Sequence, residues 1–81
     1  MTISELADAL RGVCDALDRT AAYTAAATGP LEEAKAVLLG ARRVEDGWYP
    51  ADLDLAIADV GRAGELVARG RQAVIDYLTR L

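Results

Sequence analysis

A seven-residue repeat of uncharged, mostly apolar side chains runs through the first half of the chain, and it restricts what this sequence can fold into. Taking Ile3 as position a, the a positions are Ile3, Leu10, Leu17, Thr24, Leu31 and Leu38. The d positions are Leu6, Val13, Thr20, Ala27, Ala34 and Ala41. A repeat sustained over this length, with few strand signals around it, predicts a long amphipathic helix.

The charged residues between Ile3 and Ala34 all lie at positions b, c and f. They are Glu5, Asp8, Arg11, Asp15, Asp18, Arg19, Glu32 and Glu33. The e and g positions up to Val37 carry no charge except at Lys35. A two-stranded coiled coil has charged e and g flanks, whereas an apolar face that extends to e and g is typical of a helix with two or more neighbours. The first segment is therefore predicted to belong inside a helical bundle.

The first helical arm is predicted over residues 2–44, with Thr2 as N-cap of a capping box that Glu5 completes. Gly29-Pro30 interrupts it, and proline inside a helix costs about 3 kcal/mol. Either the helix ends near Thr28 and restarts at Pro30, which gives a three-helix bundle, or one long helix is kinked there. The repeat keeps its register across the interruption, which favours the kinked continuous helix.

A turn is predicted over residues 45–50, where Gly47 and Pro50 flank the adjacent aromatic residues Trp48 and Tyr49. A second arm is predicted over residues 50–81, with Pro50 at the first helical position. Its apolar row is Leu53, Val60, Val67, Val74 and Leu81. Gly61, Gly64 and Gly70 accompany this row, and they either allow close approach of a side chain such as Tyr23 or mark a local bend.

The predicted fold class is all-α, with residues 1–81 forming a single domain, an antiparallel helical hairpin. A lone hairpin buries only one side of each helix, and so small a core rarely supplies more than about 3–5 kcal/mol. We therefore expect a homodimer that completes a four-helix bundle, or a helical partner of similar shape. The candidate interaction residues are Trp48, Tyr49, Leu10, Val13, Leu17, Tyr23, Leu31, Leu38, Val60, Val67 and Val74.

The sequence offers little for catalysis. It contains no histidine, the commonest general base and metal ligand. Cys14 has no imidazole partner and lies on the apolar face, so it is predicted to be a buried thiol. We expect no enzymatic activity, no metal or other cofactor and no small-molecule substrate.

Composition also indicates which partners and compartments to expect. The net charge is −4 and no basic stripe is present, which argues against nucleic-acid binding. No apolar run is long enough to cross a bilayer. Glu5 and Asp8 occupy the region where a signal peptide would be basic and apolar. The predicted location is the cytoplasm, or export without a cleaved signal.

Two resemblances carry a functional implication. The segments Leu31-Glu32-Glu33-Ala34 and Ala73-Val74-Ile75-Asp76-Tyr77-Leu78, with the Gly/Pro turn between them, resemble the N-terminal helical modules of actinobacterial polymorphic toxins. A hairpin with Gly47-Trp48-Tyr49 at its turn is also similar to the WXG family of small type VII secretion substrates, which are dimeric. The turn of that family reads Trp-x-Gly, however, and its export motif has an acidic residue four positions after a tyrosine such as Tyr77.

From the residues and the resemblances together we expect a non-enzymatic helical interaction module. It would self-associate or pair with a similar hairpin, in secretion or toxin delivery. The alternative is a small intracellular regulator, of the antitoxin or immunity type, that binds one partner protein.

Overall fold

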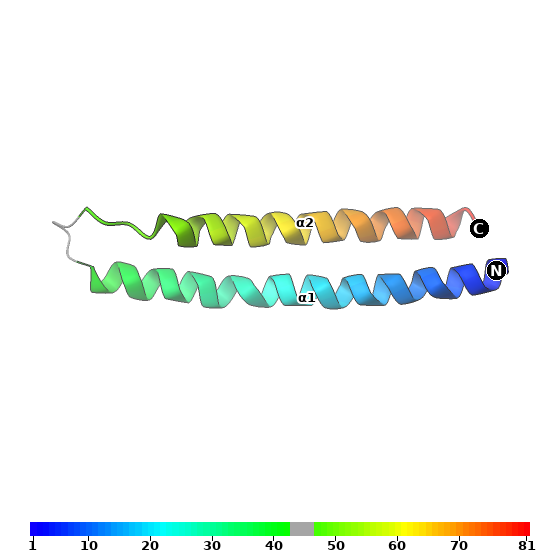
Figure 1. The fold of residues 1–81 in the computed structure, drawn as a ribbon, viewed down its shortest axis with the longest axis horizontal. Helices are drawn as coiled ribbons and strands as arrows, with labels where there is room; N and C mark the ends of the chain where they lie inside the picture. The colour runs from blue at the N-terminus through cyan, green and yellow to red at the C-terminus, as the bar shows by residue number, and fades with distance from the viewer. Residues whose placement is uncertain (43–46) are drawn as a thin grey trace.

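The chain forms an antiparallel hairpin of two long helices, as Figure 1 shows for a computed structural model that describes residues 1–42 and 47–81. Helix α1 spans Ile3–Ala41 and helix α2 spans Ala51–Thr79. Both termini lie at the same end, and the Cα atoms extend over 66 × 15 × 15 Å. The predicted all-α hairpin is confirmed, and the described residues contain no strand.

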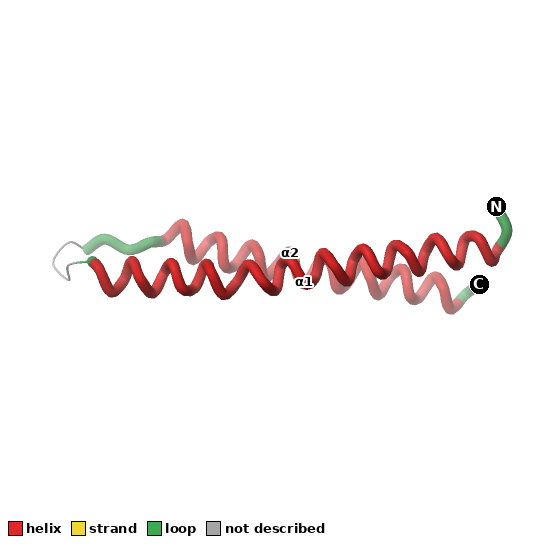
Figure 2. The backbone as a smooth tube through the Cα atoms, turned by 90° about the horizontal axis from the view of Figure 1, so that it is seen from below, coloured by secondary structure: helices red, strands yellow, loops and turns green. Residues whose placement is uncertain are grey.

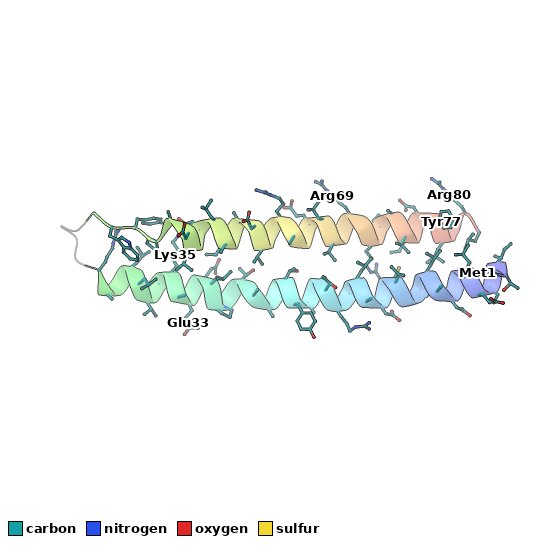
Figure 3. All side chains as sticks on the ribbon, viewed as in Figure 1. Met1, Glu33, Lys35, Arg69, Tyr77 and Arg80 are labelled. Atoms are coloured by element: carbon teal, nitrogen blue, oxygen red, sulfur yellow. The ribbon has the colours of Figure 1, made fainter. Side chains whose placement is uncertain are left out.

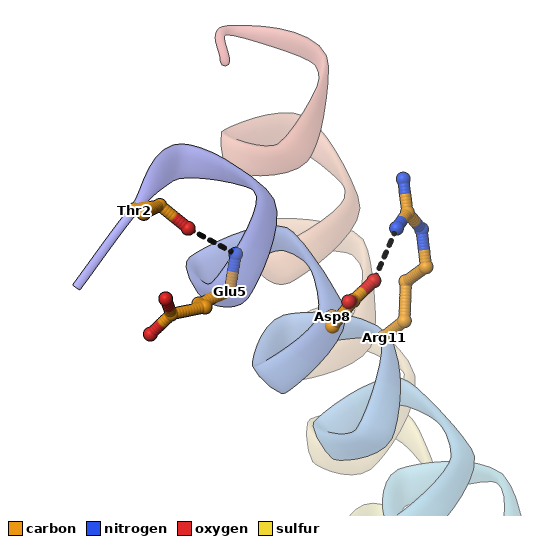
Figure 4. Close-up of polar contacts among 4 residues, drawn as sticks. All are labelled: Thr2, Glu5, Asp8 and Arg11. Carbon is orange, nitrogen blue, oxygen red and sulfur yellow. Dashed lines mark hydrogen bonds and ion pairs between the residues drawn. The ribbon is translucent and has the colours of Figure 1, made fainter.

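Helix α1 begins as its first residues predict. Thr2 has an extended backbone, and its hydroxyl oxygen accepts a hydrogen bond from the Glu5 backbone N–H at 3.0 Å (Figure 4). This bond satisfies one of the amide groups that have no partner inside the first turn. One turn further, Arg11 donates to Asp8 at 3.0 Å on the solvent side. The N-cap assignment of Thr2 is confirmed.

Pro30 lies inside α1, and the helix continues through Gly29-Pro30 to Ala41. The structure therefore has the continuous first arm and not the three-helix chain. Proline removes the N–H that would donate to the carbonyl of Ala26, so this turn of the helix lacks one hydrogen bond. The unbroken repeat on both sides of Pro30 explains the outcome, because it keeps the same face of α1 against α2 along the whole length.

The hairpin tip differs in detail from the predicted boundaries. Helix α1 ends at Ala41 and α2 begins at Ala51, so both arms are shorter than predicted. Pro50 is the N-cap of α2 and not its first helical residue. The predicted turn over residues 45–50 lies partly outside the described residues. Its described part includes Gly47, whose φ of +65° favours glycine.

The two helices cross at a shallow angle near their middles (Figure 2), and they meet along positions a and e of the repeat. When the lettering is started again with Leu53 at position a, most of the half-buried residues of α2 also lie at a and e. The seam residues of α1 are Ala7, Leu10, Cys14, Leu17, Ala21, Thr24, Thr28, Leu31, Lys35 and Leu38. Those of α2 are Leu53, Ile57, Val60, Gly64, Val67, Arg71, Val74 and Leu78.

This seam is thin. Among the described residues only Cys14, 7% exposed, and Pro50 are buried. The prediction of a buried Cys14 thiol is confirmed. Most other seam side chains are half-buried, because each touches one neighbouring helix and solvent on the remaining sides. The hairpin has a line of contact where a larger domain would have a core.

One glycine in α2 allows a close approach, although not by the residue expected. A Cβ built on Gly64 would lie 3.4 Å from the hydroxyl oxygen of Thr24. Thr24 also donates to the Ala21 carbonyl at 2.9 Å, which folds its side chain back along α1. Tyr23, the expected neighbour of these glycines, is instead 76% exposed. Its g position explains this, because it places the ring outside the seam.

Candidate interaction surface

The predicted interaction residues divide into three groups in the structure. The first group lies in the seam between the helices and is half-buried within the chain itself. Its members are Leu10, Leu17, Leu31, Val60, Val67 and Val74. In the isolated hairpin these side chains already have an intramolecular neighbour. They are less suited to an outside partner than the two exposed groups.

One side of the hairpin, formed by the b positions next to the seam, carries two ion pairs between the helices. The Arg71 Nε lies 2.6 Å from an Asp18 carboxylate oxygen, and the Lys35 Nζ lies 2.6 Å from Asp54. Asp18 and Asp54 are both b residues, so each ion pair joins a b position of one helix to an e position of the other. Figure 3 shows Lys35 between the helices.

A shallow hollow confirms which positions share this side. Its lining includes Ala25 of α1 and Gly61 of α2, both at position b. The b positions of the two helices therefore flank the same side of the seam. Position d lies across the seam from b on each helix, so the d residues of α1 and α2 share the opposite side.

We call this opposite side the open face. On α1 it consists of the d and g positions, eleven residues without a charge: Leu6, Ala9, Val13, Ala16, Thr20, Tyr23, Ala27, Pro30, Ala34, Val37 and Ala41. On α2 it comprises Ala56, Ala63, Leu66, Gly70, Ala73 and Tyr77. Asp52 and Asp59 are its charged members at g positions on the outer edge of α2, and Arg80 occupies the g position just after the helix ends.

The open face leaves large apolar side chains in solvent. Tyr23 is 76% exposed, Val37 63% and Leu66 56%. Val13, which the repeat placed at d, is also exposed because position e and not d completes the intramolecular seam. Glu33 of α1 and Arg69 of α2 both occupy position c, and each points away from the other helix (Figure 3). The charged residues of α1 thus lie away from the open face.

The aromatic tip forms the third group of predicted residues. The Lys35 Nζ lies 5.5 Å from the centre of the Tyr49 ring, and the Arg42 guanidinium carbon lies 5.9 Å from it. Arg42 also donates a hydrogen bond to the Trp48 carbonyl oxygen. Trp48 and Tyr49 are each about half exposed and line a hollow with Leu38. The tip is thus folded back onto the end of α1.

The ion pair beside the tip changes the titration of both partners. The hydrogen bond from Lys35 is the main reason that the pKa of Asp54 lies below its ordinary value of 3.8, and Tyr49 contributes less. The same bond from the other side, followed again by Tyr49, raises the pKa of Lys35. Both groups remain partly exposed to solvent, so the pair contributes little to overall stability.

We expect Asp54→Asn to lower the melting temperature slightly at pH 7 and to have no effect near pH 2. Because the folded-state pKa of Asp54 is lowered, its stabilising charge is present above its unfolded pKa, about 4, and is lost as pH falls through the folded value. The raised pKa of Lys35 has no influence in this acid range. The measurement is the melting temperature of both proteins by circular dichroism between pH 2 and pH 7. A difference that stays constant with pH would contradict the assignment.

The described residues provide little else for a site. They contain no group of three or more side chains of the histidine, cysteine, aspartate and glutamate type that could hold a metal ion. Within the same part of the chain, neither helix is both long and apolar enough to cross a membrane. The acidic pair Glu45-Asp46 lies outside the described residues. Searches against family models, curated proteins and solved structures find no match to this chain.

A prediction of interaction residues that is based mainly on the a row identifies only part of the open face. Val13 and Tyr23 were among the predicted interaction residues, while Val37, Leu66 and Tyr77 were not. The signal that could have found them is the uncharged g row of α1, which combines with the d row into a second repeat of alternating three and four residues. That repeat is as long as the seam, and the order of the residues alone is enough to reveal it.

Proposed function

We propose that this protein is a non-enzymatic helical interaction module that self-associates through the open face. The observation that carries the proposal is the second uncharged repeat on α1, which runs from Leu6 to Ala41 and is exposed in the hairpin at nine of its eleven positions. Two hairpins stacked on these faces would form a four-helix bundle, in which each helix packs against two others.

The large exposed surface area supports packing of a second hairpin against the first. The chain exposes 5917 Å² for a mass of 8.6 kDa. A compact monomer of this mass exposes about 4,700 Å², so the hairpin exposes about 1,200 Å² more. A standard interface buries about 800 Å² on each partner. The excess surface is therefore sufficient for a stable dimer.

The charge distribution also supports a second copy as the partner. The net charge of each chain is −4, so two copies repel each other unless their charges are kept apart. On α1 the acidic residues lie at b, c and f, which point away from the open face. The contact region between two copies would thus be uncharged along both α1 helices, and burying it would require desolvating no ionic group there.

A role in secretion or toxin delivery, which the sequence resemblances imply, is consistent with such a module. In that setting assembly is the contribution of the hairpin, and any chemistry belongs to other domains or partners. This part of the proposal rests on the resemblance alone.

The direct test is the molar mass of the purified protein by size-exclusion chromatography with light scattering, at micromolar concentration and above. We expect twice the chain mass of 8.6 kDa. A mass of one chain across the whole concentration range would overturn self-association.

The half-exposed aromatic tip favours a second candidate function, a small regulator that binds one partner protein. Trp is among the residues that dominate interface energetics, and Trp48 is 48% exposed beside a hollow lined by Leu38 and Tyr49. The variant Trp48→Ala separates the two functions. It would leave the mass of a self-associated hairpin unchanged, but it would remove binding to a partner that docks on the tip.

A further inference from the structure

We infer that the two copies associate antiparallel, with the two-fold axis passing beside Tyr23 and Leu66. The inference rests on the proposed self-association and adds its geometry. In this arrangement the α1 helices of the two copies face each other in opposite directions, and the tips lie at opposite ends of the bundle. The contact is isologous, so the same residues contribute from both copies.

The register within one hairpin places the two axis residues at the same level. The ion pair between Asp18 and Arg71 marks one level along the hairpin, and a second ion pair marks another with the same register. Tyr23 lies five residues after Asp18, and Leu66 lies five residues before Arg71. Since the helices run in opposite directions, Tyr23 of α1 and Leu66 of α2 lie at the same height along the hairpin. Both belong to the open face.

Tyr23 is also the middle member of the g row on α1. Under a two-fold axis beside it, residues of the g row that are equally far on either side face each other in the other copy, and the d residues pair within one residue of the same level. Apart from Tyr23, which meets its own copy at the axis, a larger side chain then faces a smaller one along both rows. The facing pairs are Leu6 with Ala41, Ala9 with Val37, Val13 with Ala34, Ala16 with Pro30, and Thr20 with Ala27.

Alternating large and small residues across facing positions allows helices to interdigitate without voids. In a parallel arrangement the two-fold axis runs along the helices, so α1 of one copy would face α2 of the other. With the register that the two ion pairs set, Val13 would then lie against Tyr77 and Tyr23 against Leu66, while Ala34 would meet Ala56. Large side chains would thus face large ones, and small ones would face small ones. The size pattern of the open face therefore favours the antiparallel arrangement.

Helix α2 shows the same pattern without being used to place the axis. With Leu66 beside the axis, Tyr77 faces Ala56 of the other copy and Ala63 faces Gly70. Tyr77, which is 48% exposed in the single hairpin, would be covered by a small side chain. Asp59 would face Ala73 at the outer edge, where its carboxylate keeps contact with solvent.

Disulfide trapping tests the orientation. Val13→Cys and Ala34→Cys are made separately in a Cys14→Ala background, which removes the native thiol. If that background does not fold, Cys14→Val replaces it. In the antiparallel dimer, residue 13 faces residue 34 of the other copy, whereas the two residues 13 lie about 31 Å apart along the helices at 1.5 Å per residue. A disulfide requires Cα atoms within about 7 Å.

We expect an equimolar mixture of the two variants, after exchange of subunits, to give at least tenfold more covalent dimer on mild oxidation than either variant alone. Efficient trapping of each variant with itself would place each residue beside its own copy and overturn the inference, while self-association would stand. A dimer by light scattering that no combination traps would mean that α1 packs against α2 of the other copy or that the contact lies on another face, and would also overturn it. A monomeric mass would instead overturn the proposed function on which the inference rests.

Discussion

Replacing Pro30 with alanine is expected to stabilise the hairpin by about 3 kcal/mol. Pro30 lies inside α1, where it removes the hydrogen bond to the Ala26 carbonyl and its ring crowds the preceding turn. Alanine restores the N–H and has the highest helix propensity. The proline side chain is exposed, so its loss removes few contacts within the chain. For a domain of this size the expected rise in melting temperature is more than about 10 °C, measured by circular dichroism.

Gly29→Ala is the matched control for the preceding residue. A Cβ at Gly29 would meet nothing within 4 Å, so this change gains only the difference in helix propensity, about 1 kcal/mol. If Pro30→Ala were neutral or destabilising, Pro30 would be acting as a favourable first residue of a separate helix. That result would restore the three-helix alternative that the sequence alone left open.

The fold could largely be predicted because two features of the repeat indicate it. The a row alone predicts a long helix, and its uninterrupted register across Pro30 favours continuity over a break. The repeat does not indicate which flank of the a row meets α2, since d is uncharged and e carries a charge only at Lys35 within α1. The structure uses e, where Cys14 is buried, and the b-to-e ion pairs such as Asp18 with Arg71 fix that choice.

The same ambiguity limited the prediction of the interaction surface. A candidate set built on the a row selects residues such as Leu17 and Leu31, which the hairpin covers itself. The residues left in solvent are mostly those of the d and g rows. Val37 belongs to the g row, which a prediction based on the a row does not include. The tip boundaries also depend on local geometry. Pro50 caps α2 from outside because Leu53 N–H donates to its carbonyl.

Placing a charge at the centre of the open face is expected to dissociate the dimer. In Tyr23→Glu the two introduced carboxylates would face each other beside the two-fold axis, partly removed from water and without a cationic partner. Removing an ionic group from water without a partner costs several kcal/mol, and like charges add repulsion. We expect the dissociation constant to rise at least about 100-fold, which corresponds to about 2.7 kcal/mol, in sedimentation equilibrium or concentration-dependent light scattering.

Ala26→Glu adds the same charge to the same helix three residues away and serves as the control. Ala26 occupies position c, in line with Arg19 and Glu33, and is exposed on the outer side of α1. We expect its dissociation constant to stay within about twofold of the wild-type value, because exposed charge changes away from an interface have small effects. Equal weakening by both variants would mean that the added negative charge acts through overall repulsion. No effect of Tyr23→Glu would mean that another surface joins the two copies. A selective effect at Tyr23 would identify the second repeat as the contact, because both variants add the same charge to the same helix.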